Sequence, residues 1–452
     1  MKRLLRVVPL VLLGCARYVA RPLDTGDVAA HYHARRLDDP AVVAALDSLG
    51  VPADRTVWRD WDLAQAAWVL RPERARLTAE IRAGEAARIT AGARPQPTIA
   101  TETEYSFSGS GAESRWGLAL STVFTAERGG KRGARIGLAS AQLLATRARA
   151  QEEAWAVRWR VREALADQAQ AERLASAAAR ELALTDSVLA ILRTRYTEGG
   201  VTRSDLARVE AERQGAAAEA AARLRDLMMS RAFVAVDVGL PPAAMDPLPP
   251  VHDSTAWCAG MAAQDSLEHT ALGSRWEIYR ALAGYQVAEA ELRLEVAKSW
   301  PDVQLGPGLF FDHGVDKWTV AFALPALPFN RNQGPIAEAE ARREVAGRRV
   351  AEVQDHVLGE VGQAAAGCMA AATEAAALDL TGVREREALT AAAYQRGEVG
   401  RLEVAFARLE LARAERRLAE AAGRVVAAGL ALERAMGIWT GATPVGWDKG
   451  DL

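Results

Sequence analysis

The sequence predicts a mainly α-helical protein with four membrane β-strands, built from two copies of one structural repeat. Three observations predict this fold: a short motif is written twice, two stretches of more than sixty residues have continuous helical character, and four segments of about ten residues alternate apolar with small or polar side chains. We expect long helical hairpins, and strands that other copies of the chain complete into a β-barrel.

The duplicated motif lies at residues 196–206 and again at 394–404. Tyr, Gly, Val, Arg, an acid and an aliphatic residue recur in one order, with Tyr196 matching Tyr394. Each copy sits between long alanine-rich helical stretches, so its glycine indicates the tip of a helical hairpin, where positive φ lets the chain reverse. The predicted organisation is a signal peptide (1–14), a lipidated N-terminal extension (15–60), a first structural repeat (61–236), an inter-repeat linker (237–265), a second structural repeat (266–436) and a C-terminal tail (437–452).

Composition excludes several function classes. The chain of 452 residues has a net charge of −2, so no nucleic acid is implied as a partner. Six His and three Cys are scattered, and His31 and His33 in the polar, irregular stretch 16–57 indicate a solvated pair, so no metal site and no cofactor are expected. No nucleophile, acid-base pair or phosphate loop stands at a meaningful spacing. We do not expect an enzyme.

The first residues are typical of an export signal. A basic start precedes the apolar run 7–13, which is too short to span a bilayer, and Leu-Leu-Gly-Cys15 resembles the bacterial lipobox. This resemblance implies that Cys15 carries a lipid, and Ala16 after it implies delivery to the outer membrane. Leu13 departs from the small residue usual at its position, so a plain signal peptide is the alternative.

Four segments have the alternation that only a strand places on two faces: 98–108, 115–125, 302–311 and 317–325. Their length and pattern match transmembrane barrel strands. Four strands cannot close a barrel with a usable interior, and an open edge in lipid is prohibitive, so other copies of the chain must complete them. The alternative is two amphipathic hairpins on a soluble helical core. The predicted lipid-facing residues are Ile99, Tyr105, Phe107, Trp116, Leu118, Leu120, Leu305, Leu309, Trp318, Val320 and Phe322.

The predicted helices are unusually long, and their lengths indicate how they pack. Residues 132–198 contain no proline and form one pattern roughly 100 Å long at about 1.5 Å per residue. The helices 204–234 and 266–298 together match that length, so we expect them to stack end to end beside it. In the second half, the helices 401–436 and 61–93 together match the length of the helix 335–396, so we expect the same arrangement there.

The linker 237–265 contains five prolines and indicates a non-helical belt between the halves. Cys258 lies in it, and Cys368 lies within the second long helix. Both would be exported to an oxidising compartment and could pair, but their separate positions favour two buried thiols.

The order helix, strand, strand, long helix, tip, helix occurs twice, and this chain resembles the TolC-like outer-membrane efflux channels over nearly its whole length after the signal. The specific motifs are the two Tyr-x-x-Gly tips and the run 327–334, where the fourth strand enters the second long helix. The run 127–135 is similar to the equivalent corner in the heavy-metal efflux subgroup. The resemblance implies a homotrimer whose strands form one β-barrel in outer-membrane lipid and whose long helical hairpins form a periplasmic α-barrel, which is a helical tunnel.

The resemblance also implies partners: a periplasmic adaptor protein, which family members meet at the helical tips, and an inner-membrane pump of the resistance-nodulation-division type. The alternative at the tips is that Gly and Val only shape the turns while the charges are solvated. The matching tip residues are Gly199, Val201, Arg203, Ser204, Asp205, Gly397, Val399, Arg401 and Glu403.

Three functions are open on the sequence. The first is the exit duct of a tripartite efflux system, for which the 127–135 corner favours metal cargo through subgroup similarity alone. The second is the exit duct of a type I protein-secretion machine. The third is a periplasmic coiled-coil lipoprotein whose hairpins never enter lipid.

Overall fold

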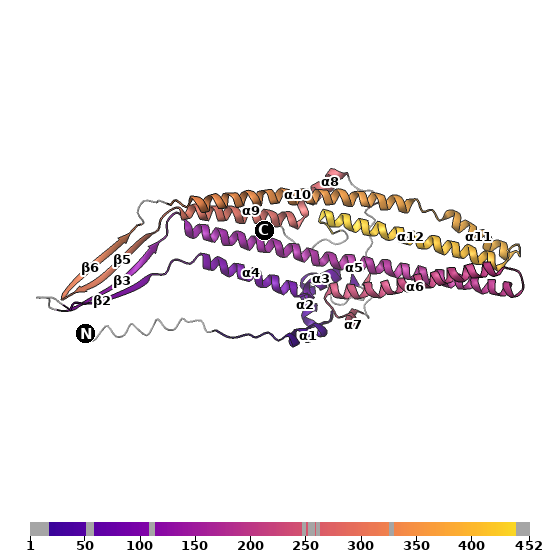
Figure 1. Cartoon of the computed structure of the whole chain (residues 1–452), viewed down its shortest axis with the longest axis horizontal. Helices are drawn as coiled ribbons and strands as arrows, with labels where there is room; N and C mark the ends of the chain where they lie inside the picture. The colour runs from indigo at the N-terminus through magenta and orange to yellow at the C-terminus, as the bar shows by residue number, and fades with distance from the viewer. Residues whose placement is uncertain are drawn as a thin grey trace.

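The chain forms a long helical layer with a four-stranded sheet at one end and two helical tips at the other (Figure 1). The structure is a computed structural model and describes residues 18–50, 58–107, 114–245, 250–251, 258, 263–324 and 330–439. The predicted signal segment and Cys15 lie outside the described residues. No helix within these ranges is long and apolar enough to cross a bilayer.

Helix α5, Lys131–Thr197, is the axis of the layer and agrees with the predicted long helix to one residue at each end. Four shorter helices contact it: α4 (Pro72–Ala91), α6 (Arg203–Val238), α9 (Trp276–Lys298) and α12 (Arg401–Met436). Figure 1 shows α4 and α6 along one side of α5, and α9 and α12 along the other. The expectation that α4 lies along the second long helix is therefore wrong within one subunit, because α4 packs on α5.

The second long helix is not continuous, which corrects the prediction of one helix over 335–396. Helix α10 spans Gln333–Ala376 and α11 spans Thr381–Gln395. In the break, the Asp379 carboxylate accepts a hydrogen bond from the backbone N–H of Thr381 at 2.8 Å. A short acidic side chain that bonds its own backbone competes with helical pairing, and this starts a new helix without any proline.

The four predicted strands form one antiparallel sheet in the order β2-β3-β5-β6. Their bounds are Thr98–Tyr105, Trp116–Ala126, Val303–Asp312 and Val315–Ala323. The central pair joins the two repeats, since Leu120 of β3 lies opposite Leu309 of β5, and Leu309 in turn lies opposite Trp318 of β6. The sheet is open, and β2 and β6 are its edges.

The N-terminal stretch is more ordered than predicted. Two helices, α1 (Thr25–Ala34) and α2 (Pro40–Ser48), occupy part of the range expected to be irregular. Aspartates cap both helices, and α2 buries Val42 and Leu46. Helix α1 is attached to the end of α6, because the Arg35 guanidinium donates to the carbonyl oxygen of Gly239 at 3.1 Å. The sequence analysis missed these helices because each has only nine or ten residues, which is too short for a clear helical period.

The linker is partly structured and covalently closed. It contains α7 (Pro242–Met245), and β4 (Pro250–Val251) pairs in parallel with β1 (Trp58–Arg59) before α8 (Gln264–Ser274). Cys258 and Cys368 form a disulfide with their Cα atoms 5.1 Å apart, so the expectation of two free thiols is wrong. The reason is that α8 packs against α10 and α12, which returns the linker to the helix that carries Cys368.

A charged and aromatic cluster, here called the equatorial hub, lies where both repeats meet near the middle of the layer. Arg162 of α5 is buried and forms ion pairs with buried Glu433 of α12 and, at 3.6 Å from Nε to Oδ2, with Asp60 at the start of α3 (Asp60–Leu70). Its guanidinium lies 4.6 Å from the ring centre of Trp439 and 5.2 Å from that of Trp159. The hub fastens the first long helix to the end of the last one.

Candidate functional site: the helical tips, a charged ladder and an exposed apolar sheet

The first tip joins α5 to α6 through a glycine in the left-handed region. Gly199 has φ of +76°, its N–H donates to the carbonyl of Tyr196, and Gly200 donates to that of Arg195. This pair of bonds is a Schellman motif, which satisfies the last carbonyls of a helix and requires positive φ at that residue. Thr202 then caps α6, because its side chain accepts from the Asp205 backbone N–H while the Asp205 carboxylate accepts from the Thr202 backbone N–H. The hydrogen bond from the Thr202 side chain is the main cause that lowers the pKa of Asp205.

The second tip repeats the same closure between α11 and α12. Gly397 has φ of +78°, its N–H donates to the carbonyl of Tyr394, and Glu398 donates to that of Ala393. The next turn differs, because Gly400 occupies the capping position that Thr202 holds in the first tip. In its place, the Arg401 side chain donates from Nε to the Tyr394 hydroxyl at 3.2 Å.

The predicted docking residues lie together at this end of the molecule (Figure 1). Gly199, Arg203, Ser204 and Asp205 are exposed in the first tip, as are Gly397, Arg401 and Glu403 in the second, whereas Val201 and Val399 are half-buried. A single long ion pair joins the tips among the described residues, between Arg195 and Glu403 at 3.9 Å. Arg203 also pairs with Glu210 at 3.7 Å within the first tip, so the charged residues of both tips are exposed but make local contacts.

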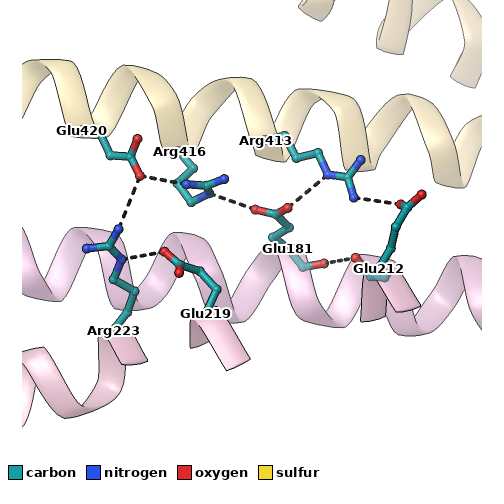
Figure 2. Close-up of polar contacts among 8 residues, drawn as sticks. Glu181, Glu212, Glu219, Arg223, Arg413, Arg416 and Glu420 are labelled. Atoms are coloured by element: carbon teal, nitrogen blue, oxygen red, sulfur yellow. Dashed lines mark hydrogen bonds and ion pairs between the residues drawn. The ribbon is translucent and has the colours of Figure 1, made fainter. Parts of the chain in front are cut away.

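Behind the tips, a chain of alternating charges ties α12 to the α5/α6 hairpin, and we call it the charged ladder (Figure 2). At its centre Glu181 of α5, largely buried, accepts hydrogen bonds from Arg413 at 3.0 Å and Arg416 at 2.9 Å. Arg413 continues to Glu212 of α6 at 3.1 Å. Arg416 continues through Glu420 to Arg223 and Glu219 on α6. This pairing could not be predicted from the sequence, because its members come from three helices far apart in the chain.

The ladder holds its arginines firmly charged. Burial acts to lower the pKa of Arg416, but hydrogen bonding and charge from Glu181 and Glu420 outweigh burial and raise that pKa above its ordinary value. The pKa of Arg413 is raised in the same way, with burial opposing Glu212 and Glu181. Arg413 donates to carboxylates on α5 and α6, and Arg416 donates to Glu181 on α5 and to Glu420 on its own helix. A displacement of α12 therefore breaks three of these charge-assisted bonds together.

The sheet exposes one apolar face. Register places Tyr105 opposite Trp116, Leu118 opposite Phe311 and Leu305 opposite Phe322, so most of the large apolar side chains of the four strands share a face. Every predicted lipid-facing residue is exposed: Ile99, Tyr105, Phe107, Trp116, Leu118, Leu120, Leu305, Leu309, Trp318, Val320 and Phe322. Trp318, for example, is 76% exposed. No helix of the described ranges covers this face (Figure 1).

The opposite face carries mostly small and polar side chains, with Phe310 as a large apolar exception. Gly308 lies opposite both Ser121 and Thr319, and Gly306 opposite Ala321. A Cβ at Gly308 would stand 3.1 Å from the Thr319 hydroxyl and 3.2 Å from a backbone oxygen, so glycine lets the strands lie closely here. The faces therefore differ as the two sides of a barrel wall differ.

Comparison with known proteins identifies the fold. No protein-family model matches the sequence, and no curated protein does. Among solved structures, the outer-membrane channel OprN is 16% identical with a TM-score of 0.68, and the match covers 90% of this chain and 95% of that chain. The outer membrane protein VceC from Vibrio cholerae is 20% identical with a TM-score of 0.65, over 83% and 95%. CusC, whose structures concern folding and transmembrane channel formation, is 18% identical with a TM-score of 0.64, over 83% and 91%. The chain has the fold of the TolC-like outer-membrane efflux channels.

Proposed function

We propose that this protein is the outer-membrane exit duct of a tripartite efflux system. Three copies form one channel through the outer membrane and periplasm, and the helical tips dock a periplasmic adaptor that connects them to an inner-membrane pump of the resistance-nodulation-division type. Cys15, outside the described residues, anchors each chain through a lipid. The observation that carries the proposal is the open four-stranded sheet with one uncovered apolar face.

The sheet supports a trimer through its strand number. Its edge strands, β2 and β6, have no neighbour on their outer side within the described chain. An unpaired edge in lipid costs several kcal/mol per backbone group, so another copy must cover it. Two copies would give eight strands, and side chains fill the interior of such a barrel, whereas three copies give twelve and leave room for a water-filled passage.

The helical layer supports the same assembly. It is a layer rather than a closed bundle, with α4 and α6 at one border and α10 and α11 at the other (Figure 1). Both borders leave large apolar side chains exposed, including Met228 and Phe233 on α6 and Met369 and Leu389 on the opposite border. Exposed apolar residues on both borders favour packing of one border against the other in the next copy.

The tips support adaptor docking because both present the same backbone closure with exposed charges beside it. A surface of this kind is small and polar, and it suits a reversible contact whose specificity comes from charge and shape. Opening then requires α12 and α11 to move away from α5 and α6. The charged ladder spans that boundary, and we propose that it holds the closed duct.

Reconstitution of the full-length protein in planar bilayers tests the proposal. We expect an SDS-resistant trimer in the outer-membrane fraction that conducts ions poorly at rest. Glu181→Gln should raise the open probability several-fold, since it removes the charge that both Arg413 and Arg416 face. The matched control is Glu410→Gln, which pairs with Arg386 within the α11/α12 hairpin and should leave conduction unchanged. A soluble monomer without conduction would leave only the scaffold function.

The type I secretion duct is the second candidate on the same fold. No feature of the described residues favours it. Co-purification of an adaptor with an ATP-driven exporter, rather than a proton-driven pump, would select it and would leave the channel itself unchanged.

A further inference from the structure

The four connections between the sheet and the helices meet in one place, here called the rim. It comprises residues 92–97, 127–135, 295–302 and 330–334. Direct contacts join its parts: the Arg132 Nε donates to the carbonyl of Gly92 at 2.6 Å, and the Lys131 ammonium binds Asp302 at 2.7 Å. The Asn332 side chain donates to Glu295. The rim is therefore one surface at the base of the apolar sheet.

Every acid of the rim has a basic partner in the rim. Glu127 pairs with Arg135, Asp302 with Lys131, and Glu295 with Lys298. The Arg135 hydrogen bond lowers the pKa of Glu127, and the Lys298 hydrogen bond lowers that of Glu295, so both acids stay ionised. These three pairs account for all the acids of the rim and for three of its seven cations.

The remaining four cations are all arginines: Arg94, Arg128, Arg132 and Arg331. All four are exposed, and none has an ion pair with an acid among the described residues. They come from the segments before β2, after β3 and after β6, so they are spread along the base of the sheet. The rim thus carries an excess of four positive charges, all of them on planar guanidinium groups.

A tryptophan accompanies these arginines at the same level. Trp300 precedes β5, is 54% exposed, and lies with its ring centre 6.0 Å from the Arg128 guanidinium. Its ring also packs against Gly129, where a Cβ would stand 2.7 Å from it, so the position of the ring is fixed. An exposed tryptophan directly below an apolar surface is the residue that proteins place among lipid headgroups.

We propose that the rim is a binding surface for phospholipid headgroup phosphates in the leaflet that faces the helices. This inference rests on the proposed membrane insertion of the sheet. An arginine fork matches a phosphate in two parallel hydrogen bonds, and its weak hydration suits a partly dry interface. The anionic headgroups fix the depth of the sheet, while the internal ion pairs keep the rim acids from repelling them.

The test uses the full-length protein purified in a non-ionic detergent. The apparent affinity for phosphatidylglycerol is measured by thermal shift and by native mass spectrometry for wild type and for the triple variant Arg94→Gln, Arg128→Gln, Arg331→Gln. A basic residue at a lipid surface contributes about fivefold in affinity, so the triple variant should bind about 100-fold more weakly. Lysine at the same three positions should restore part of the affinity.

Controls separate the possible outcomes. A triple glutamine variant at Arg225, Arg348 and Arg384, three exposed arginines on the helices, should bind as wild type does. Inorganic phosphate at equal concentration should give no shift, and an equal shift would overturn the headgroup assignment. Unchanged phosphatidylglycerol affinity in the rim variant would overturn the inference even where trimers conduct. A wild type that forms no conducting trimer would instead remove the proposed function.

Discussion

The two halves of the chain share a tip motif but differ in how firmly their long helices are held. In the first half α5 runs unbroken for 67 residues and buries side chains from Ala139 to Leu192. In the second half α10 ends at Ala376, and α11 buries no side chain at all. The duplication has thus produced one continuous long helix, α5, and one long helix that is divided into α10 and the less buried α11. Helix α11 is held in place by α12, which contacts α5 and α6 through the charged ladder and through a small apolar cluster at the tips.

This difference fits a duct that opens at one end. The α5/α6 hairpin is the fixed part, against which the α11/α12 hairpin closes. The break at 377–380 is a hinge between α10 and α11. The disulfide holds α10 on the near side of that break, since Cys368 lies eight residues before the end of α10. We therefore expect α11 to move, on the tip side of the disulfide, while α10 stays in place up to Cys368.

Loss of Arg162 should have the largest effect, because it would disconnect the axis from α12. Arg162→Ala removes the buried cation that pairs with Glu433 and Asp60, and breaking a buried pair by removing one partner costs about 3–5 kcal/mol. Urea unfolding monitored by tryptophan fluorescence would measure it. Arg408→Ala, which removes a largely exposed pair with Glu387, is the matched control at below about 1 kcal/mol. Equal costs would show that the hub is not a fastening point.

Removal of the disulfide should rank second and should affect the second half alone. Cys258→Ser with Cys368→Ser opens a loop of 110 residues, for which the loss is about 2–4 kcal/mol. A reductant should lower the thermal midpoint of wild type and leave the double variant unchanged. If the reductant lowered the thermal midpoint of both proteins, the loss of stability would not come from the Cys258–Cys368 disulfide.

The two tip glycines allow a direct comparison of the halves. Gly199→Ala and Gly397→Ala each force a side chain into the left-handed region, at a cost of about 1–2 kcal/mol, with nothing else within 4 Å of the new methyl. Gly215→Ala, in the interior of α6, should instead stabilise by about 0.5–1 kcal/mol. Both tip variants should also weaken adaptor capture. Intact capture by either would count against docking at that tip.

The sequence predicts much of the fold because the relevant signals are local. Alternation identified all four strands, and an unbroken helical pattern located α5 to one residue. The break before α11 was missed because it depends on one aspartate side chain and not on proline. The hub and the ladder were missed for a different reason: an arginine such as Arg162 or Arg413 resembles any solvated charge until the helix opposite it is known.

The smallest effect is expected at the break itself. Hydrogen bonds from Thr381 hold the pKa of Asp379 below its ordinary value, so this carboxylate stabilises the start of α11 at neutral pH and the stabilisation is lost as the pH falls below about 4. Asp379→Ala should speed amide exchange in the first turn of α11 several-fold at pH 7, and this difference from wild type should shrink as the pH falls below about 4. A uniform change along α10 would show that the break is not a separate hinge.

The central claim is that one subunit carries an incomplete barrel that three copies close, and cross-linking between the sheet edges tests it most directly. Ala100 on β2 and Thr319, Ala321 or Ala323 on β6 share the small-residue face, and within one chain β3 and β5 separate them by about 14 Å, too far for a disulfide. We predict that a cysteine at Ala100 paired with one of these three β6 positions gives a covalent ring of exactly three chains in outer membranes, while each single variant gives none. Cross-linked dimers without a three-chain ring, or no cross-link at any of the three positions, would contradict the account.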